Sequence, residues 1–242
     1  MMRQRGVVVL GCWATLVGAL LQAPAARAGF DPPSEVILGT AQTLEQGEIV
    51  IGVLSPLAYG INDSLTVFIH PVSWALLAPN GSFRFRVYDE EPVRIAAVFG
   101  GAVAVTPDGV TVEDIRRPAG HIDFGVSSTL ALGSWLLTGK VGYQRDFGPD
   151  DDDFDWSFVV DWVIGPSSLL QLQGGFQFGR IYAVKGVNAS LAYVHSWGAL
   201  HLAAGLAYGD FPLELESGVV SACPSSWNTP CLWPVIDVFW RF

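Results

Sequence analysis

The sequence is poor in charge, and above all in positive charge. Only 15% of its 242 residues are charged, against roughly 25% in soluble globular domains. It contains 13 lysines and arginines against 23 aspartates and glutamates, so its formal net charge is −10. Because nucleic-acid binding depends on basic patches that neutralise phosphates, we expect no nucleic-acid partner.

Long hydrophobic runs are missing beyond the first residues. A membrane-spanning helix needs about 18 consecutive, mostly apolar residues. Half of the residues are hydrophobic and the mean hydropathy is +0.38, yet Gly, Ser, Asp and Gln interrupt the apolar residues throughout. This combination disfavours both a helical membrane protein and a soluble enzyme.

The apolar run at the N-terminus has the features of an export signal. Arg3 and Arg5 precede it, and a small-x-small cleavage site ends at Ala28. An anchoring helix is the less favoured interpretation, because a proline precedes the cleavage site. We therefore expect residues 1–28 to be a cleaved signal peptide and residues 29–242 to form a single mature domain.

Cysteine is also scarce. Of three cysteines, only Cys223 and Cys231 follow the signal peptide. A close pair in an exported chain predicts a disulfide that closes a small loop. A metal site is the alternative, but it lacks nearby histidines or further cysteines, so we expect no metal and no cofactor.

The mature chain is instead a succession of segments in which apolar and polar residues alternate. In 154–164, apolar and aromatic side chains occupy every second position, and Asp155, Ser157 and Asp161 lie between them. The segments 81–88, 121–132, 135–146 and 169–178 repeat the pattern. Alternation of this kind predicts strands with two different faces.

The polar faces of these strands are unlike those of a soluble sandwich. They carry mostly Gln, Ser, Thr and Gly, whereas aromatic residues gather at the strand ends, as expected when lipid lies outside and a polar lumen inside. Strands of about 10 residues match a tilted membrane span. Open edges would leave amides unpaired in lipid. The predicted fold class is therefore all-β: a closed, antiparallel, up-and-down transmembrane β-barrel.

The last strand alternates to the final residue, with Ile236, Val238, Trp240 and Phe242 on one face. This ending resembles the C-terminal recognition signal of Gram-negative outer-membrane β-barrel proteins, which finish on an aromatic residue, usually Phe. The resemblance implies a small, porin-like barrel in the bacterial outer membrane. Its expected partners are outer-membrane lipid, lipopolysaccharide and the barrel-insertion machinery that reads the terminal strand.

Twelve strands are expected, an even number as bacterial barrels favour. With both termini periplasmic, the long connections 72–80, 105–119, 147–153 and 210–231 all fall outside. If residues 30–46 are instead a periplasmic lead or a plug, ten strands are the alternative. The twelve predicted strands are 35–42, 48–58, 64–71, 81–88, 92–104, 120–132, 135–146, 154–164, 168–179, 183–195, 199–209 and 232–242.

Charged residues at inward positions are the main candidate site. Arg84, Arg86 and Arg94 form a basic wall opposite Asp155 and Asp161, an arrangement that would orient charged or dipolar solutes. Alternatively, the charges pair and close the lumen, because small barrels are often filled. The full set of expected lumen charges is Glu48, Arg84, Arg86, Arg94, Asp123, Lys140, Asp155, Asp161, Asp237 and Arg241.

Small inward residues favour an underfilled lumen. From them we expect a narrow passive diffusion channel for small hydrophilic solutes. The alternative is a closed-lumen barrel with a structural, adhesive or receptor role, for which the loop holding the two cysteines is a candidate binding tip. The small residues are Gly125, Ser127, Gly142, Gly175, Gly186, Ser190, Ala203 and Gly205.

Two further clusters are weaker candidates. The run Asp150–Asp153, like Glu113 and Asp114, lies in an expected outer loop; it lacks the spacing of a calcium loop, so we interpret it as solvated charge. His121 and Asp123, with Asp155 across the wall, would suit a rim-active hydrolase in which a base activates water. Paired acids opposite are missing, Ser127 lacks a separate orienting acid, and His70 and His201 are isolated, so we expect no enzyme and no catalytic residue.

Overall fold

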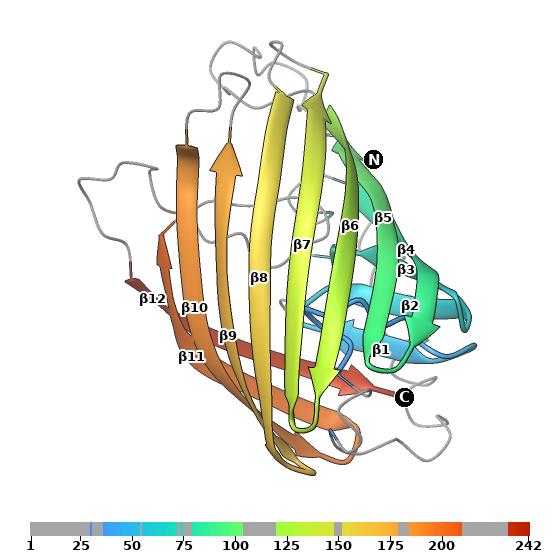
Figure 1. Ribbon diagram of the computed structural model, residues 1–242, viewed down its shortest axis with the longest axis vertical. Coiled ribbons are helices and arrows are strands. Elements are labelled where there is room, and N and C mark those ends of the chain that lie inside the picture. The colour runs from blue at the N-terminus through green and yellow to red at the C-terminus, as the bar shows by residue number, and fades with distance from the viewer. Residues whose placement is uncertain are drawn as a thin grey trace, which may run out of the picture.

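The computed structural model describes residue 30 and residues 36–53, 55–71, 74, 79–103, 120–147, 152–178, 184–209 and 232–242. Within these residues, no helix is long and apolar enough to cross a membrane. Twelve antiparallel strands follow one another around a closed, up-and-down barrel, which β12 completes by pairing with β1 (Figure 1). The predicted fold class and the predicted number of strands are thus confirmed.

The strand bounds set the frame for all that follows. The strands are β1 (Ile49–Gly52), β2 (Leu57–Asn62), β3 (Leu65–Ile69), β4 (Asn80–Glu90), β5 (Val93–Val103), β6 (Gly120–Leu132), β7 (Trp135–Asp146), β8 (Asp152–Gly165), β9 (Ser168–Phe178), β10 (Val184–Trp197), β11 (Leu200–Gly209) and β12 (Leu232–Arg241). Short turns join strands at one end of the barrel. We call that end periplasmic, after the usual arrangement of outer-membrane barrels, and the other end outer.

Alternation places the two faces of each strand as predicted. In β8, Phe154, Trp156 and Trp162 are exposed on the outside, whereas Val159 and Asp161 are buried inside. The same alternation of exposed aromatic or aliphatic side chains with buried ones runs through β4 and β6. An apolar outer surface of this kind suits a lipid environment.

The prediction of a strand at 35–42 is wrong. Residues 36–48 instead lie inside the lumen, in its periplasmic half; we call residue 30 and residues 36–48 the plug. The predicted strand 48–58 is also wrong as one element, because the chain turns at Ser55 and Pro56 and forms β1 and β2. Proline cannot donate a ladder hydrogen bond, so it interrupts the strand there. The two errors cancel in the strand count.

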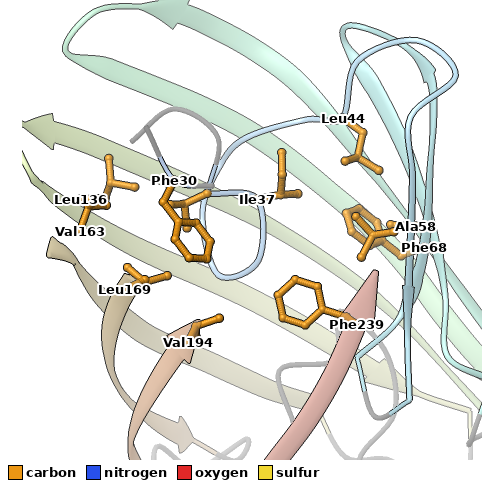
Figure 2. Close-up of a cluster of buried hydrophobic side chains, with 12 residues drawn as sticks. Phe30, Ile37, Leu44, Ala58, Phe68, Leu136, Val163, Leu169, Val194 and Phe239 are labelled. Atoms are coloured by element: carbon orange, nitrogen blue, oxygen red, sulfur yellow. The ribbon is translucent and has the colours of Figure 1, made fainter. Parts of the chain in front are cut away.

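The plug builds a conventional hydrophobic core within the periplasmic half of the lumen. Phe30, Ile37 and Leu44 pack among inward-facing apolar side chains of the wall (Figure 2). Leu44 is fully buried. The wall contributes Val50, Ala58, Phe68, Leu136, Val163, Leu169, Val194 and Phe239.

The barrel wall is uneven in height. The strands β6–β10 run most of the height of the molecule, whereas β1–β3 are confined to its lower half (Figure 1). The strands β1, β2 and β3 hold 4, 6 and 5 residues, fewer than the 9–11 or so of a typical transmembrane strand. The plug contacts both the short and the tall strands, because its core includes Phe68 of β3 and Leu136 of β7.

Candidate functional site: the plugged lumen

Arg84 holds the plug from the wall. Its side chain is only 2% exposed. The Nη1 atom donates hydrogen bonds to the main-chain oxygens of Gln42 at 2.6 Å and Ile37 at 3.2 Å. The guanidinium carbon lies 4.7 Å from the centre of the Phe68 ring, a cation–π contact. The buried cation thus donates to two main-chain oxygens of the plug, which satisfies its own hydrogen-bonding groups.

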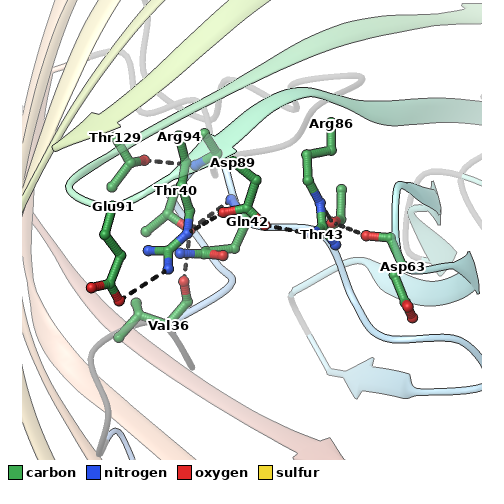
Figure 3. Close-up of polar contacts among 11 residues, drawn as sticks. Val36, Thr40, Gln42, Thr43, Asp63, Arg86, Asp89, Glu91, Arg94 and Thr129 are labelled. Atoms are coloured by element: carbon green, nitrogen blue, oxygen red, sulfur yellow. Dashed lines mark hydrogen bonds and ion pairs between the residues drawn. The ribbon is translucent and has the colours of Figure 1, made fainter. Parts of the chain in front are cut away.

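The other two arginines of the expected basic wall also face the plug. Arg86 donates from Nε to Thr43 Oγ1 at 3.0 Å, and it pairs with Asp89 on the same strand. Arg94 donates from Nε to Asp89 Oδ1 at 2.7 Å (Figure 3). Asp89 therefore bridges the two arginines. The basic wall consequently contacts the plug and its own acidic partners, which leaves it little capacity to orient a passing solute.

Wall hydroxyls receive the plug's main-chain N–H groups. Ala41 N donates to Thr129 Oγ1 at 2.8 Å, and Leu44 N donates to Thr66 Oγ1 at 2.8 Å. Thr129 is in turn hydrogen-bonded to Thr138 at 2.8 Å. Because a buried segment outside the sheet must still find hydrogen-bond partners for its main chain, these threonines take the place of a neighbouring strand.

Three further acidic lumen residues form hydrogen bonds or an ion pair with other parts of the barrel. Glu48, the last plug residue, forms a buried ion pair with Arg241 of β12. Asp237 accepts hydrogen bonds from both the main-chain N and the hydroxyl of Ser55. Asp161 accepts from Gln171 Nε2 at 2.8 Å. Of the expected lumen charges, these and the three arginines cluster in the periplasmic half.

The remaining lumen charges lie higher. Asp123 and Asp155 point inward from the outer halves of β6 and β8, and Lys140 lies on β7 between them. A Cβ atom at Gly100 would lie 2.6 Å from Asp123 Oδ2 and 2.8 Å from Ser82 Cβ, so a larger residue there would displace one of these side chains. The structure therefore separates the expected charges into a periplasmic group, part of which contacts the plug, and an outer group.

Of the residues considered for a hydrolase, the described part of the chain brings His121 and Asp123 together. His121 Nε2 lies 3.6 Å from Asp123 Oδ1. Ser127 is buried, and its Oγ has no hydrogen-bond partner among the described residues. His201 stacks on Phe239, with ring centres 4.6 Å apart, beneath Phe30 of the plug. His70 is buried beside Asn80, whose Oδ1 accepts from the His70 main-chain N.

Several expected features fall outside the described residues: the signal peptide 1–28, the disulfide of Cys223 and Cys231, and the outer-loop acids Glu113, Asp114, Asp150 and Asp151. The rest of the acidic run begins β8, where Asp152 pairs with Arg145 and Asp153 is buried. Across the part of the chain that the structure describes, no group of three or more His, Cys, Asp or Glu side chains can hold a metal ion.

The face of the C-terminal strand agrees with the expected one. Ile236 is 61% exposed, and Val238, Trp240 and Phe242 are partly exposed on the same outer side. The main chain of Phe242 exchanges two hydrogen bonds with Ile49, of 2.9 and 3.0 Å. The last residue therefore takes part in closing the barrel.

Sequence reasoning missed the plug's partners. Thr66, Thr129 and Thr138 are polar residues at inward positions, and Leu136, Val163 and Phe239 are apolar residues at inward positions, yet neither group was assigned a role. The signal was present, because apolar residues at inward positions indicate that something apolar fills the lumen beside them.

Comparisons with known proteins add a likeness of fold. No protein-family model matches the chain, and no curated protein matches it. Two solved structures of OmpT, an outer membrane protein of Vibrio cholerae, are similar to it. The in-vitro folded form is 13% identical with a TM-score of 0.45, covering 77% of this chain and 63% of that chain. The outer-membrane expressed form is 12% identical with a TM-score of 0.48, and the match covers 77% of this chain and 64% of that chain. This chain thus spans less than two thirds of their length, and the likeness is one of fold alone.

Proposed function

We propose that the protein is an integral outer-membrane surface barrel whose lumen is closed at the periplasmic end by its own N-terminal segment. The apolar core between plug and wall carries this proposal (Figure 2). An aqueous passage needs a polar lining, whereas inward Phe68, Leu136 and Phe239 gain stability only when covered. Burial of this kind favours a permanent closure over a water-filled channel.

The second candidate is the diffusion channel for small hydrophilic solutes, operating only when the plug is displaced. The outer half of the lumen favours it, because its inward residues are small or polar, such as Gly125, Gly142 and Lys140. In a closed barrel, by contrast, function resides in the outer loops, with an adhesive or receptor role. Both candidate functions include insertion of the barrel through recognition of Phe242 and contact with lipopolysaccharide.

Conductance of the refolded mature protein in planar bilayers separates the two. We expect a folded but silent barrel. In the variant Leu44→Asp, a carboxylate replaces a fully buried side chain of the plug, so the plug should leave its core. Gln46→Asp, at an exposed position of the same segment, is the matched control and should stay silent.

Each outcome is informative. Discrete ohmic steps from the unmodified protein would overturn the closed barrel and leave the passive channel. Steps from Leu44→Asp alone would support a plugged passage. Silence of a folded Leu44→Asp variant would eliminate the passage and leave the surface barrel.

A further inference from the structure

The lipid-facing surface carries a polar cluster near the periplasmic end, made of Ser168 on β9 with Tyr193 and His195 on β10. Their neighbours Leu169 and Val194 point into the core, so these three side chains point outward. Ser168 Oγ lies 2.9 Å from Tyr193 OH and 3.1 Å from His195 Nδ1. Tyr193 OH lies 3.3 Å from the same nitrogen.

Apolar residues surround this cluster on the outer face. Strand pairing places Trp162 and Leu170 on one side, and Leu202 and Ala204 on the other. Polar groups on a lipid-facing surface are costly unless they are satisfied. The mutual hydrogen bonds of the cluster meet only part of that need.

Tryptophans fix the depth of the cluster in the membrane. Trp135 and Trp162 stack with ring centres 5.2 Å apart, near the periplasmic ends of β7 and β8. Trp197, the last residue of β10, meets the His195 ring edge-on at 4.4 Å. Because Trp and Tyr gather where lipid headgroups begin, the cluster lies at headgroup level.

The Nε2 atom of His195 is available for a hydrogen bond to a ligand. The Nδ1 atom of the same ring is within reach of two hydroxyl groups, which can donate to it. When one of these hydroxyls donates to Nδ1, the neutral ring carries its proton on Nε2. Among the described residues, no hydrogen bond to Nε2 occurs. In that tautomer the Nε2–H group, on the ring that meets Trp197, can donate to an acceptor outside the chain.

We propose that Ser168, Tyr193 and His195 form a binding site for the phosphate group of a phospholipid in the periplasmic leaflet. Phosphate oxygens are acceptors for the Nε2–H group and for a hydroxyl, and charge strengthens both bonds. The acyl chains of the same lipid lie along Leu170 and Leu202, which share the outer face. A membrane phospholipid is the occupant because it alone offers phosphate and apolar chains at this depth.

Selective ¹⁵N labelling of histidine reports the contact directly, since the chain has only four histidines. The full mature protein is compared in nanodiscs of phosphatidylglycerol and of a galactolipid with the same acyl chains. We expect the Nε2 resonance of His195, assigned by its loss in His195→Phe, to shift in phosphatidylglycerol only. An equal resonance in both lipids would overturn the proposal. If inorganic phosphate shifted the same Nε2 resonance in galactolipid nanodiscs, the site would bind free phosphate, and the proposal of a bound phospholipid would be wrong.

Lipid retention in native mass spectrometry is the second measurement. We expect His195→Phe and Tyr193→Phe to retain one bound phosphatidylglycerol about tenfold less than the unmodified protein, as loss of a charge-assisted hydrogen bond implies. Tyr208→Phe changes an outward tyrosine at the outer end of β11 and should retain lipid normally. Equal retention by all variants, with folding verified by heat-modifiable gel mobility, would contradict the site.

Discussion

At the scale of single residues, Arg84 shows how the wall keeps the plug. A fully buried guanidinium normally lowers stability unless its donors are satisfied. Here the main-chain oxygens of Ile37 and Gln42 satisfy it, and the ring of Phe68 covers it. The cation and the plug therefore depend on each other.

Replacing Arg84 by methionine should lower the free energy of unfolding by about 2 to 3 kcal/mol, because two plug carbonyls then lose a charged donor. Denaturant titration of the protein in detergent micelles measures this change in the free energy of unfolding. Arg145→Met is the control: Arg145 is an exposed arginine paired with Asp152 at the outer rim, and its loss should have a clearly smaller effect because solvent screens exposed ion pairs. An Arg84→Met variant as stable as this control would show that the plug does not need the cation.

The side of the barrel wall to which each side chain points could be predicted from the sequence, whereas the residues that it contacts could not. The period of two assigns Trp156 to lipid and Asp155 to the lumen, since a strand offers only two sides. It places Arg84 in the lumen for the same reason. What meets Arg84 there depends on a segment some forty residues earlier in the chain, and no local pattern encodes that contact.

At the scale of elements, the plug resembles a strand in sequence because it carries buried, β-branched residues, although its main chain turns between Ile37 and Thr40. Val36 and Ile37 have high β propensity, but neither Val36 nor Ile37 belongs to the barrel sheet. Gly39 and Gly47 adopt positive φ values of 82° and 83°, which favour glycine and break extended chain. These glycines, and Pro56 in the predicted second strand, are the local signals that separate the plug from the true strands.

Because the plug shares its core with the wall, trimming it should weaken the whole barrel. Leu44→Ala should lower the free energy of unfolding by about 2–5 kcal/mol, the range for a buried leucine. Leu172→Ala, at a lipid-facing position that is 44% exposed, should lower the free energy of unfolding by a clearly smaller amount. Urea unfolding followed by tryptophan fluorescence compares the two. If Leu44→Ala left the transition midpoint unchanged, the plug would be an independent element and not part of the core.

At the scale of the whole molecule, the barrel closes unevenly. Strand β12 pairs with β11 over nine residues but with β1 over three, from Gly52↔Phe239 to Val50↔Arg241. The last bond on the β1 side runs from Val53 N to Val238 O. No described residue pairs with the outer part of β12, residues 232–236, on that side. A one-sided edge therefore runs along the seam between the short and tall parts of the wall.

Hydrogen exchange tests this uneven seam. Even-numbered residues of β12 direct their main-chain groups toward β1, as the bonds of Val238 and Phe242 show, so the N–H of Ile236 points to the open side. Pro234 stands at the same edge, where its missing N–H costs nothing. The amide of Ile236 should exchange orders of magnitude faster than that of Phe239, which faces β11. Equal protection of the two amides would mean that another segment or molecule pairs with this edge, and the seam would then be closed along its full height.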